Sequence, residues 1–322
     1  TARLTLCAVS SFVGLQLLAW CENIGVRVMG IAAASLSSNL GDMSFFQLAT
    51  RYPTMITQSM GGYAAGSGAA GLIGSFVYTL LTGASVGASP SLVLSGVGIV
   101  PAVMLLVYFL VLPKPSTNSV SKGGDSLIGD LGLADKLRLV GPLIWGYMAP
   151  LAALMFLENI TTQGILPTIL YHLPLPSPLS TLFTIPRDFY PFFFTTYQLA
   201  IFLGRSSITL FRLPGHNRGS CAAYWALVAV ESLCLLALLT HSISMALPSA
   251  DDGVARKIAA VAGCVFIMGL CGGLGMSNTY WRFLISTIAL PDVAAIFVAS
   301  LLSLWVQPAL CQLQVGAGRG GC

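Results

Sequence analysis

The amino-acid sequence predicts an all-α protein that crosses a membrane several times. Of its 322 residues, 56% are hydrophobic and only 8% are charged, whereas about 25% of the residues of a soluble protein are charged. The mean hydropathy is +0.84, and the apolar residues gather in segments long enough to span a bilayer. These segments are too long for the strands of a membrane β-barrel, and they do not alternate polar with apolar residues. We therefore expect bundles of transmembrane helices.

The apolar segments predict about nine transmembrane helices. The second and the fifth are the least regular, because each contains polar residues and glycine. The glycine count of 34 is high, as is typical where helices approach closely in a membrane. The segments are Leu4–Trp20, Val26–Leu48, Met60–Thr82, Leu92–Leu112, Val140–Thr162, Phe192–Leu213, Ala222–Leu247, Ile258–Thr279 and Ile288–Leu310.

Two polar connections divide the chain. The segment 113–138 is rich in glycine and serine, which predicts a flexible loop. It separates a partial N-terminal bundle of about four spans, residues 1–112, from a C-terminal bundle of about five spans, residues 139–312, followed by a tail at 313–322. The stretch Tyr171–Tyr190 is rich in proline and aromatic residues, and we expect it to lie at the membrane interface rather than across it.

The charges outside the spans predict an orientation and exclude one class of partner. Lys and Arg are more numerous on the side of the loop 113–138, which places this loop in the cytosol and Tyr171–Tyr190 in the lumen or outside. The net charge of +4 is small and no basic run occurs, so nucleic acid is not an expected partner.

The positive charge of Arg205 needs compensation, because it lies near the centre of the predicted span Phe192–Leu213. A guanidinium in hydrocarbon costs at least about 2.5–3.5 kcal/mol. It therefore requires a counter-charge, a water-filled cavity or a ligand. Glu158 is one candidate counter-charge, in the polar stretch LENITTQG, and Gly164 and Pro167 predict that its helix breaks close behind it.

The acidic residues in the spans allow several interpretations. Glu158 and Asp42, the latter in SLSSNLGDMSFFQ, could each form a structural ion pair with Arg205. Either could instead line a transport pathway, where it would bind substrate or carry a proton. Glu231 lies near the end of a predicted span, which favours a packing or interfacial role. Asp292 follows a proline at the start of the last span, and helix capping is its expected role.

Glycine and cysteine patterns favour packing over catalysis. The run Gly61–Gly74 has small residues at a spacing of four, which predicts tight helix packing, and no GK[ST] follows it as in a nucleotide loop. In Cys271–Tyr280, Ser277 and Asn278 could also face a cavity.

The histidines are scattered, and the sequence has no zinc motif, GxSxG or phosphate loop, so we expect neither an enzyme nor a cofactor. Six cysteines in or at the ends of apolar segments are expected to be buried free thiols: Cys7, Cys221, Cys234, Cys264, Cys271 and Cys311.

Six blocks of the sequence resemble the battenin family, which comprises lysosomal and vacuolar membrane proteins linked to Batten disease. The blocks occur in the family's order and cover nearly the whole chain. They are SLSSNLGDMSFFQLATRYP, AAGSGAAGLIGSFVYTLL, LENITTQG, YQLAIFLGRSS, GLCGGLGMSNTY and DVAAIFVASLLSLWVQPALCQL. The resemblance also implies that further spans precede Thr1, so that the chain is an N-terminally incomplete member, and that the segment between Tyr280 and Asp292 is shorter than in the family.

The resemblance implies a fold like the major facilitator superfamily and residence in a lysosomal or vacuolar membrane. It further implies roles in lumenal pH homeostasis, in basic amino-acid transport and in the clearance of glycerophosphodiesters. Six residues match the family's polar intramembrane positions: Asp42, Glu158, Gln163, Arg205, Ser206 and Ser207.

Together these features predict a transporter with a polar cavity between two bundles. Arg205 would hold an anionic group such as a phosphodiester or a carboxylate, and Ser206 and Ser207 would add hydroxyls beside it. Glu158 or Asp42 could take a proton from an acidic lumen and couple it to rocking of the bundles. The alternative is a membrane scaffold that does not transport and that recruits trafficking partners through the cytosolic loop.

Overall fold

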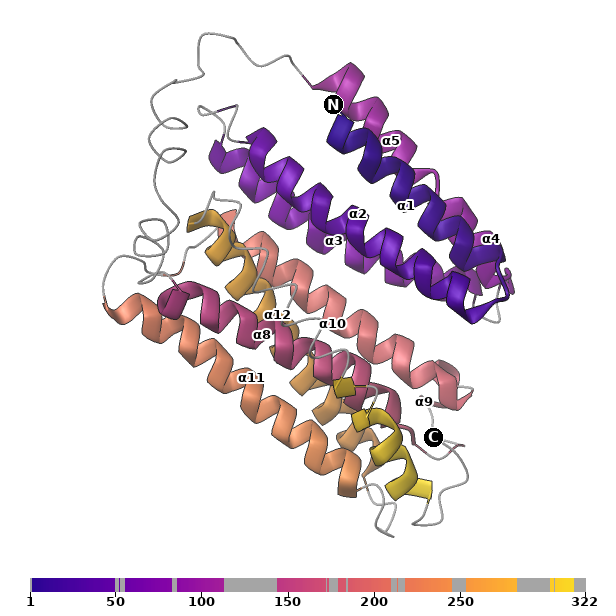
Figure 1. Cartoon of the computed structure of the whole chain (residues 1–322). Helices are drawn as coiled ribbons and strands as arrows, with labels where there is room; N and C mark the ends of the chain where they lie inside the picture. The colour runs from indigo at the N-terminus through magenta and orange to yellow at the C-terminus, as the bar shows by residue number, and fades with distance from the viewer. Residues whose placement is uncertain are drawn as a thin grey trace. The chain divides into compact units, whose positions relative to one another are not determined.

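The structure, a computed structural model, consists of helices and the turns that join them (Figure 1). No β-strand occurs in the residues that it describes, which confirms the predicted all-α class. The chain forms two compact units, and each is described by itself. The first unit holds the described residues of Thr1–Met60 and Phe76–Leu131, and the second holds those of Gly61–Ser75, Gly132–Phe283 and Leu290–Cys322. The described residues are 2–49, 52, 56–82, 86–112, 144–171, 173, 179–183, 185–209, 213, 218–244, 253–282, 302–303 and 305–315.

Within the described residues, five helical segments are long and apolar enough to cross a membrane. They coincide with the first, third, fourth, seventh and eighth predicted spans, so the chain is a polytopic membrane protein. The total of about nine spans and the two-bundle arrangement stay predictions. The five segments are Arg3–Trp20, Gly61–Thr82, Pro90–Val111, Ala222–Ser244 and Val254–Thr279.

The first unit is built around a helical hairpin. Helices α1 and α2 are joined by three residues and pack along each other, and they approach most closely at two glycines. A Cβ atom on Gly14 would lie 2.7 Å from the carbonyl oxygen of Gly30, so larger residues would push the helices apart. The elements of this unit are α1 (Ala2–Trp20), α2 (Ile24–Ala49), α4 (Pro90–Val97), α5 (Val100–Leu106) and a π-helix (Val107–Val111).

Neutral hydrogen bonds hold the other helices of this unit to α1. The hydroxyl of Ser37 in α2 donates to the carbonyl oxygen of Cys7 at 2.7 Å. The indole N–H of Trp20 donates to the hydroxyl of Ser95 in α4, also at 2.7 Å. Helix α4 begins after Ser89, whose side chain accepts a hydrogen bond from the N–H of Leu92, as is usual at a helix N-terminus.

Helix α3 (Ile56–Thr82) contributes Gly61–Ser75 to the second unit. Its close contacts are formed by only part of the predicted small-residue pattern. A Cβ atom on Gly68 would lie 2.9 Å from the Cα of Phe202, and one on Gly71 would overlap the side chain of Gln198. By contrast, Cβ atoms on Gly62, Gly66 and Gly74 would meet nothing within 4 Å. Within the described residues, the predicted tight packing therefore holds at Gly68 and Gly71, with Ala64 also buried, and not at Gly62, Gly66 or Gly74.

The second unit packs α8, α10 and α11 against α12, and the backbones of α10 and α12 touch. A Cβ atom on Gly273 would lie 2.7 Å from the carbonyl oxygen of Ile201, and one on Gly204 would lie 3.1 Å from the Cα of Gly273. The elements of this unit are a π-helix (Ile144–Met148), α8 (Ala149–Ile160), a second π-helix (Thr161–Ile165), a 3₁₀ turn (Leu166–Thr168), α9 (Leu179–Leu182), a 3₁₀ turn (Pro186–Asp188), α10 (Phe189–Ser206), a 3₁₀ turn (Ser207–Thr209), α11 (Arg218–Ser244) and α12 (Val254–Arg282).

The predicted break behind Glu158 is present. Helix α8 ends at Ile160, passes into a π-helix at Thr161–Ile165, and then tightens into a 3₁₀ turn that contains Pro167. Proline has no N–H to donate and its ring clashes with the carbonyl four residues earlier, so the regular hydrogen-bond pattern cannot continue through it. Single-turn π segments of this kind are frequent at functional sites.

Two expectations about residue placement were wrong. Helix α10 ends at Ser206 instead of continuing to Leu213, so Arg205 lies in the last turn of the helix and not near its middle. Glu231 lies midway along α11 and not near a span end. A cation at a helix C-terminus is stabilised by the macrodipole, which gives Arg205 a favourable local setting that the sequence pattern did not indicate.

Several other predictions can be compared only in part. The loop 113–138, Asp292 and most of the segment Ile288–Leu310 lie outside the described residues, whereas residues 305–315 are helical. Among the predicted free thiols, Cys311 is instead disulfide-bonded, which corrects that expectation. Four others are free: Cys7, Cys234 and Cys271, which are buried, and Cys264, which is half-buried.

Candidate functional site

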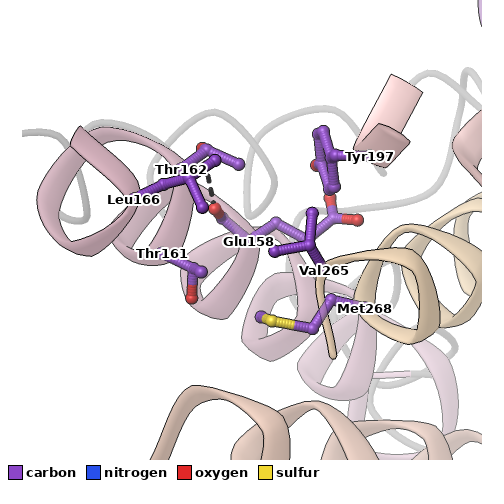
Figure 2. A pocket seen from close by; sticks show the side chains of 7 residues that line it. All are labelled: Glu158, Thr161, Thr162, Leu166, Tyr197, Val265 and Met268. Carbon is purple, nitrogen blue, oxygen red and sulfur yellow. Dashed lines mark hydrogen bonds between the residues drawn. The ribbon is translucent and has the colours of Figure 1, made fainter. Parts of the chain in front are cut away.

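A small pocket lies inside the second unit, at the break that follows α8 (Figure 2). Three parts of the unit meet there: the end of α8 with the π-helix and turn behind it, the middle of α10, and the middle of α12. We call this the carboxyl pocket, because Glu158 is its acidic residue. It leaves no space for a water molecule. Its lining residues are Glu158, Thr161, Thr162, Leu166, Tyr197, Val265 and Met268.

The periodicity of α8 directs Glu158 inward. Its neighbours three and four positions earlier, Met155 and Leu154, are buried, and Glu158 itself is only 3% exposed. Its carboxyl group lies against Gly272 of α12, because a Cβ atom on that glycine would overlap the carboxylate oxygen Oε1. The backbone carbonyl of Glu158 accepts a hydrogen bond from the hydroxyl of Thr162 at 2.8 Å, which satisfies an acceptor at the point where the helix breaks.

Tyr197 places a phenol beside this carboxyl group. It belongs to the buried face of α10, together with Phe193 and Ile201 four residues on either side. Its ring points toward the carboxyl group of Glu158 in Figure 2, and its hydroxyl is within hydrogen-bonding reach of that group. Tyr197 was not among the predicted site residues, although it lies in the block YQLAIFLGRSS.

A second carboxyl group approaches from α11. Glu231 is fully buried, in a stripe with Tyr224 and Leu238 that recurs every seven residues. It interacts electrostatically with Glu158 and with the backbone of Gly272. The predicted role of Glu231 was packing or interfacial, although its seven-residue spacing from Tyr224 and Leu238 was a signal that it faces inward.

Arg205 forms its hydrogen bond with a neutral partner rather than with Glu158. Its Nη1 donates to the hydroxyl of Ser67 in α3 at 2.9 Å, and the charge of Arg205 also acts on Tyr197. Its buried Nε has no hydrogen-bond partner within the described residues. Asp42 is half-buried on α2 in the first unit. The structural ion pair between Arg205 and Glu158 is therefore not formed in this arrangement.

The remaining predicted site residues lie outside the lining of the carboxyl pocket. Gln163 is exposed, and its amide donates to Asn159 at 2.9 Å. Ser206 is half-buried next to Ser207, whose hydroxyl donates to the carbonyl of Gly204 at 2.7 Å. In the part of the chain that the structure describes, no group of three or more metal-ligating side chains could hold a metal ion.

Asn278 connects α12 to the chain beyond α10. It is only 1% exposed. Its amide donates to the carbonyl of Leu274 at 2.9 Å, and its side-chain oxygen accepts from the N–H of Leu213 at 2.8 Å. Because both ends of the amide are engaged with backbone, Asn278 holds two segments together in this arrangement.

The family model of the CLN3 protein matches residues 1–129 and 121–313, which together span nearly the whole chain. The chain belongs to the CLN3 family. The resemblance to battenins is thereby confirmed. Protein btn1 of Schizosaccharomyces pombe is 29% identical over 345 residues, covering 99% of this chain and 81% of the relative.

Other fungal relatives show the same extent of similarity. Protein BTN1 of Yarrowia lipolytica is 29% identical over 348 residues, covering 99% of this chain and 82% of the relative. Protein BTN1 of Cryptococcus neoformans is 27% identical over 436 residues, covering all of this chain and 83% of the relative. The chain is thus similar to these proteins across both of its units.

Proposed function

We propose that this CLN3-family protein is a battenin-like transporter of a lysosomal or vacuolar membrane. It moves small polar metabolites, either basic amino acids or glycerophosphodiesters, and contributes to lumenal pH homeostasis. The observation that carries the proposal is the buried carboxyl group of Glu158, which lies at a helix break inside a membrane protein. Ionisable residues in membrane helices mark substrate or proton pathways by default, because their burial is costly.

The break behind α8 supports transport. In secondary transporters, discontinuous helices supply backbone groups and termini to sites near the middle of the membrane. The carboxyl pocket has no space for water, so a metabolite requires a different arrangement of the helices. Alternating access requires a state, between the two open ones, in which the site is closed to both sides of the membrane.

Arg205 supplies the positive charge for an anionic group of the substrate. Its guanidinium has five N–H donors, and only Nη1 donates to protein, to Ser67, within the described residues. The N–H group of its buried Nε has no acceptor within the described residues. Ser206 and Ser207 follow Arg205 directly. The hydroxyl of Ser207 donates to the carbonyl of Gly204 in this arrangement, so it would turn to the anionic group when the helices rearrange. A phosphodiester or a carboxylate fits the planar guanidinium fork.

The test is efflux from isolated vacuoles or lysosomes that contain the variants Glu158→Gln and Arg205→Ala. We expect each to lower efflux of the metabolite about tenfold or more, equivalent to about 1.4 kcal/mol in the barrier. The matched controls are Glu22→Gln and Arg256→Ala, because both side chains are exposed. Normal efflux in both site variants would overturn the transport proposal.

One observation favours a second candidate function. The carboxyl pocket has no space for water, and a membrane protein that transports no metabolite would also have such a pocket. In that case the chain is a membrane scaffold that recruits trafficking or pH-regulating partners through the loop 113–138. Deletion of 114–136 would then abolish the cellular phenotype, and Glu158→Gln would leave it intact. The transporter predicts the reverse pattern.

A further inference from the structure

Two carboxyl groups from different helices converge on one glycine. Glu158 reaches Gly272 from α8, so closely that a Cβ atom on the glycine would overlap its Oε1. Glu231 approaches from α11, where the backbone of the same glycine and the charge of Glu158 both act on it. We call Glu158 and Glu231 the carboxyl pair. Gly272 makes the pair possible, because any side chain at that position would occupy the space of a carboxyl group.

The carboxyl pair is enclosed, and part of its bonding capacity is unused. Glu158 is 3% exposed and Glu231 is 0% exposed. Neither oxygen of Glu231 accepts a hydrogen bond of ordinary geometry from the described residues, and the same holds for the hydroxyl oxygen of Thr161, which lines the carboxyl pocket. Buried polar atoms are nearly always bonded in native proteins, so unused ones require an explanation.

Among the described residues, the surrounding groups supply too little positive charge for two carboxylates. The nearby cation is Arg205, whose Nη1 is engaged with Ser67. Two adjacent carboxylates in a dry environment require either a full set of counter-charges or a proton between them. The ionisable groups that interact with the pair or with its neighbours are Tyr197 and Arg205 on α10, Cys234 on α11, and Cys264 and Cys271 on α12.

The size of the site selects the ligand. The carboxyl pocket admits no water molecule, so neither a hydrated cation nor a metabolite fits beside Glu158. A proton needs no such space, and it turns one carboxyl group into a donor that the other can accept. We propose that Glu158 and Glu231 form a proton-binding site in which the two carboxyl groups share one proton. This deepens the proposed transport function, on which its role in coupling rests, by naming the group that carries the proton.

The proton site can be tested on the purified full-length chain without measuring transport. Dicyclohexylcarbodiimide reacts with protonated carboxyl groups in apolar surroundings, and it reaches the closed carboxyl pocket when the helices of the unit separate. Peptide mass spectrometry locates the adduct. Across a series from acidic to alkaline pH, we expect adducts on the carboxyl pair, with at most one adduct per chain, and none on exposed Glu22. Absence of adducts on both residues at every pH would overturn the proposal, as would chains that carry two adducts at neutral or alkaline pH, because both carboxyl groups of a shared site are protonated only in acid.

Two variants and one competitor sharpen this test. Glu231→Gln should shift the pH at which Glu158 stops reacting by about one unit or more, because its neighbour no longer changes charge. Gly272→Ala should displace Glu158 and abolish the adducts, whereas Gly263→Ala on the same helix should not, because a Cβ atom there meets nothing within 4 Å. The proposal of a shared proton would be overturned if the pH dependence of labelling did not shift in Glu231→Gln. It would also be overturned if sodium ions protected the carboxyl pair of the wild type from labelling.

The outcome is independent of the transport measurement. Adducts on the carboxyl pair together with normal efflux in Glu158→Gln would keep the proton site and reject the transport function. Loss of efflux without adducts would do the opposite. If the variants are unstable, labelling of the wild-type chain still shows whether the carboxyl pair binds a proton, because that measurement uses no variant.

Discussion

The two units of the chain pack their helices in similar ways but bury different chemistry. In the described part of the first unit, Ser37 is the buried polar side chain, and its hydroxyl bonds to a backbone carbonyl. In the second unit the buried polar residues include both members of the carboxyl pair. They are Glu158, Thr161, Thr162, Thr168, Glu231, Ser242, Ser277, Asn278, Thr279, Ser303 and Gln314.

This difference separates the requirements of packing from those of function. Helices α1 and α2 meet at Gly14 and Gly30 without any buried charge, and α10 and α12 meet at Gly204 and Gly273 in the same manner. Close helix contacts therefore do not explain the acidic residues of the second unit. Their burial is costly, and helix packing alone does not require it.

The largest expected effect tests whether packing is equally important in the two units. Gly14→Val and Gly273→Val should each destabilise the protein by about 1–3 kcal/mol, because the new side chain meets backbone atoms of the facing helix. Thermal unfolding in detergent measures this. Gly62→Val serves as the control, since a Cβ atom there meets nothing within 4 Å. Equal melting temperatures for all three variants would contradict the close contacts.

The next prediction compares acidic residues between the units. Glu231→Gln should lower efflux about tenfold, equivalent to about 1.4 kcal/mol, because the carboxyl pair loses the ability to exchange its proton. Asp42→Asn, at a half-buried position in the first unit, should lower efflux less. Initial efflux rates from vacuoles, normalised to protein amount, measure both. A larger loss in Asp42→Asn would move the functional chemistry into the first unit.

A smaller effect is expected from single hydroxyl groups. Ser67→Ala removes the acceptor of Arg205 and should cost about 1.5 kcal/mol, because hydrogen bonds to charged groups are the stronger ones. Ser37→Ala removes a neutral hydrogen bond and should cost about 1 kcal/mol. Denaturant titration of the two variants measures the difference. Greater destabilisation by Ser37→Ala would show that Arg205 does not depend on Ser67.

The smallest effect is expected at the outer face of the helix break. Gln163→Ala removes an exposed amide that bonds to Asn159, so stability should change by no more than about 0.5 kcal/mol. Efflux should stay at the wild-type rate, because the side chain of Gln163 is exposed and not enclosed with Glu158. A strong loss of efflux would place a substrate contact on this outer face.

Features that depend on local sequence were predictable. Five spans follow from long apolar runs, and the break behind α8 follows from Gly164 and Pro167. Membership of the CLN3 family was visible because six blocks keep their order along the chain. The end of α10 was not predictable in the same way, because apolar residues (Ile208, Leu210, Phe211 and Leu213) continue beyond Ser206. Hydropathy shows where a chain is apolar, but not where its helical hydrogen bonds stop.

The composition of the site depends on tertiary packing and was predicted only in part. Glu158 was identified from its own sequence context. Gly272 leaves space for the carboxyl groups of Glu158 from α8 and Glu231 from α11, and Gly269 lets α10 approach with Tyr197. These contacts join residues far apart in the chain. The sequence proposed acidic partners for Arg205, whereas the structure gives it Ser67. Which partner a charged side chain meets depends on which face of its helix is turned toward the neighbouring helices.

The backbone contact between α10 and α12 also limits how the second unit can move. Gly204 and Gly273 bring the backbones of the two helices close together, so a close-packed contact of this kind favours movement of the two helices as one element. Helix α12 carries Gly272, and α10 carries Arg205. A small displacement of α12 when the carboxyl pair changes charge would therefore move the guanidinium with it, and α8 and α11 would have to supply the relative motion that opens the unit.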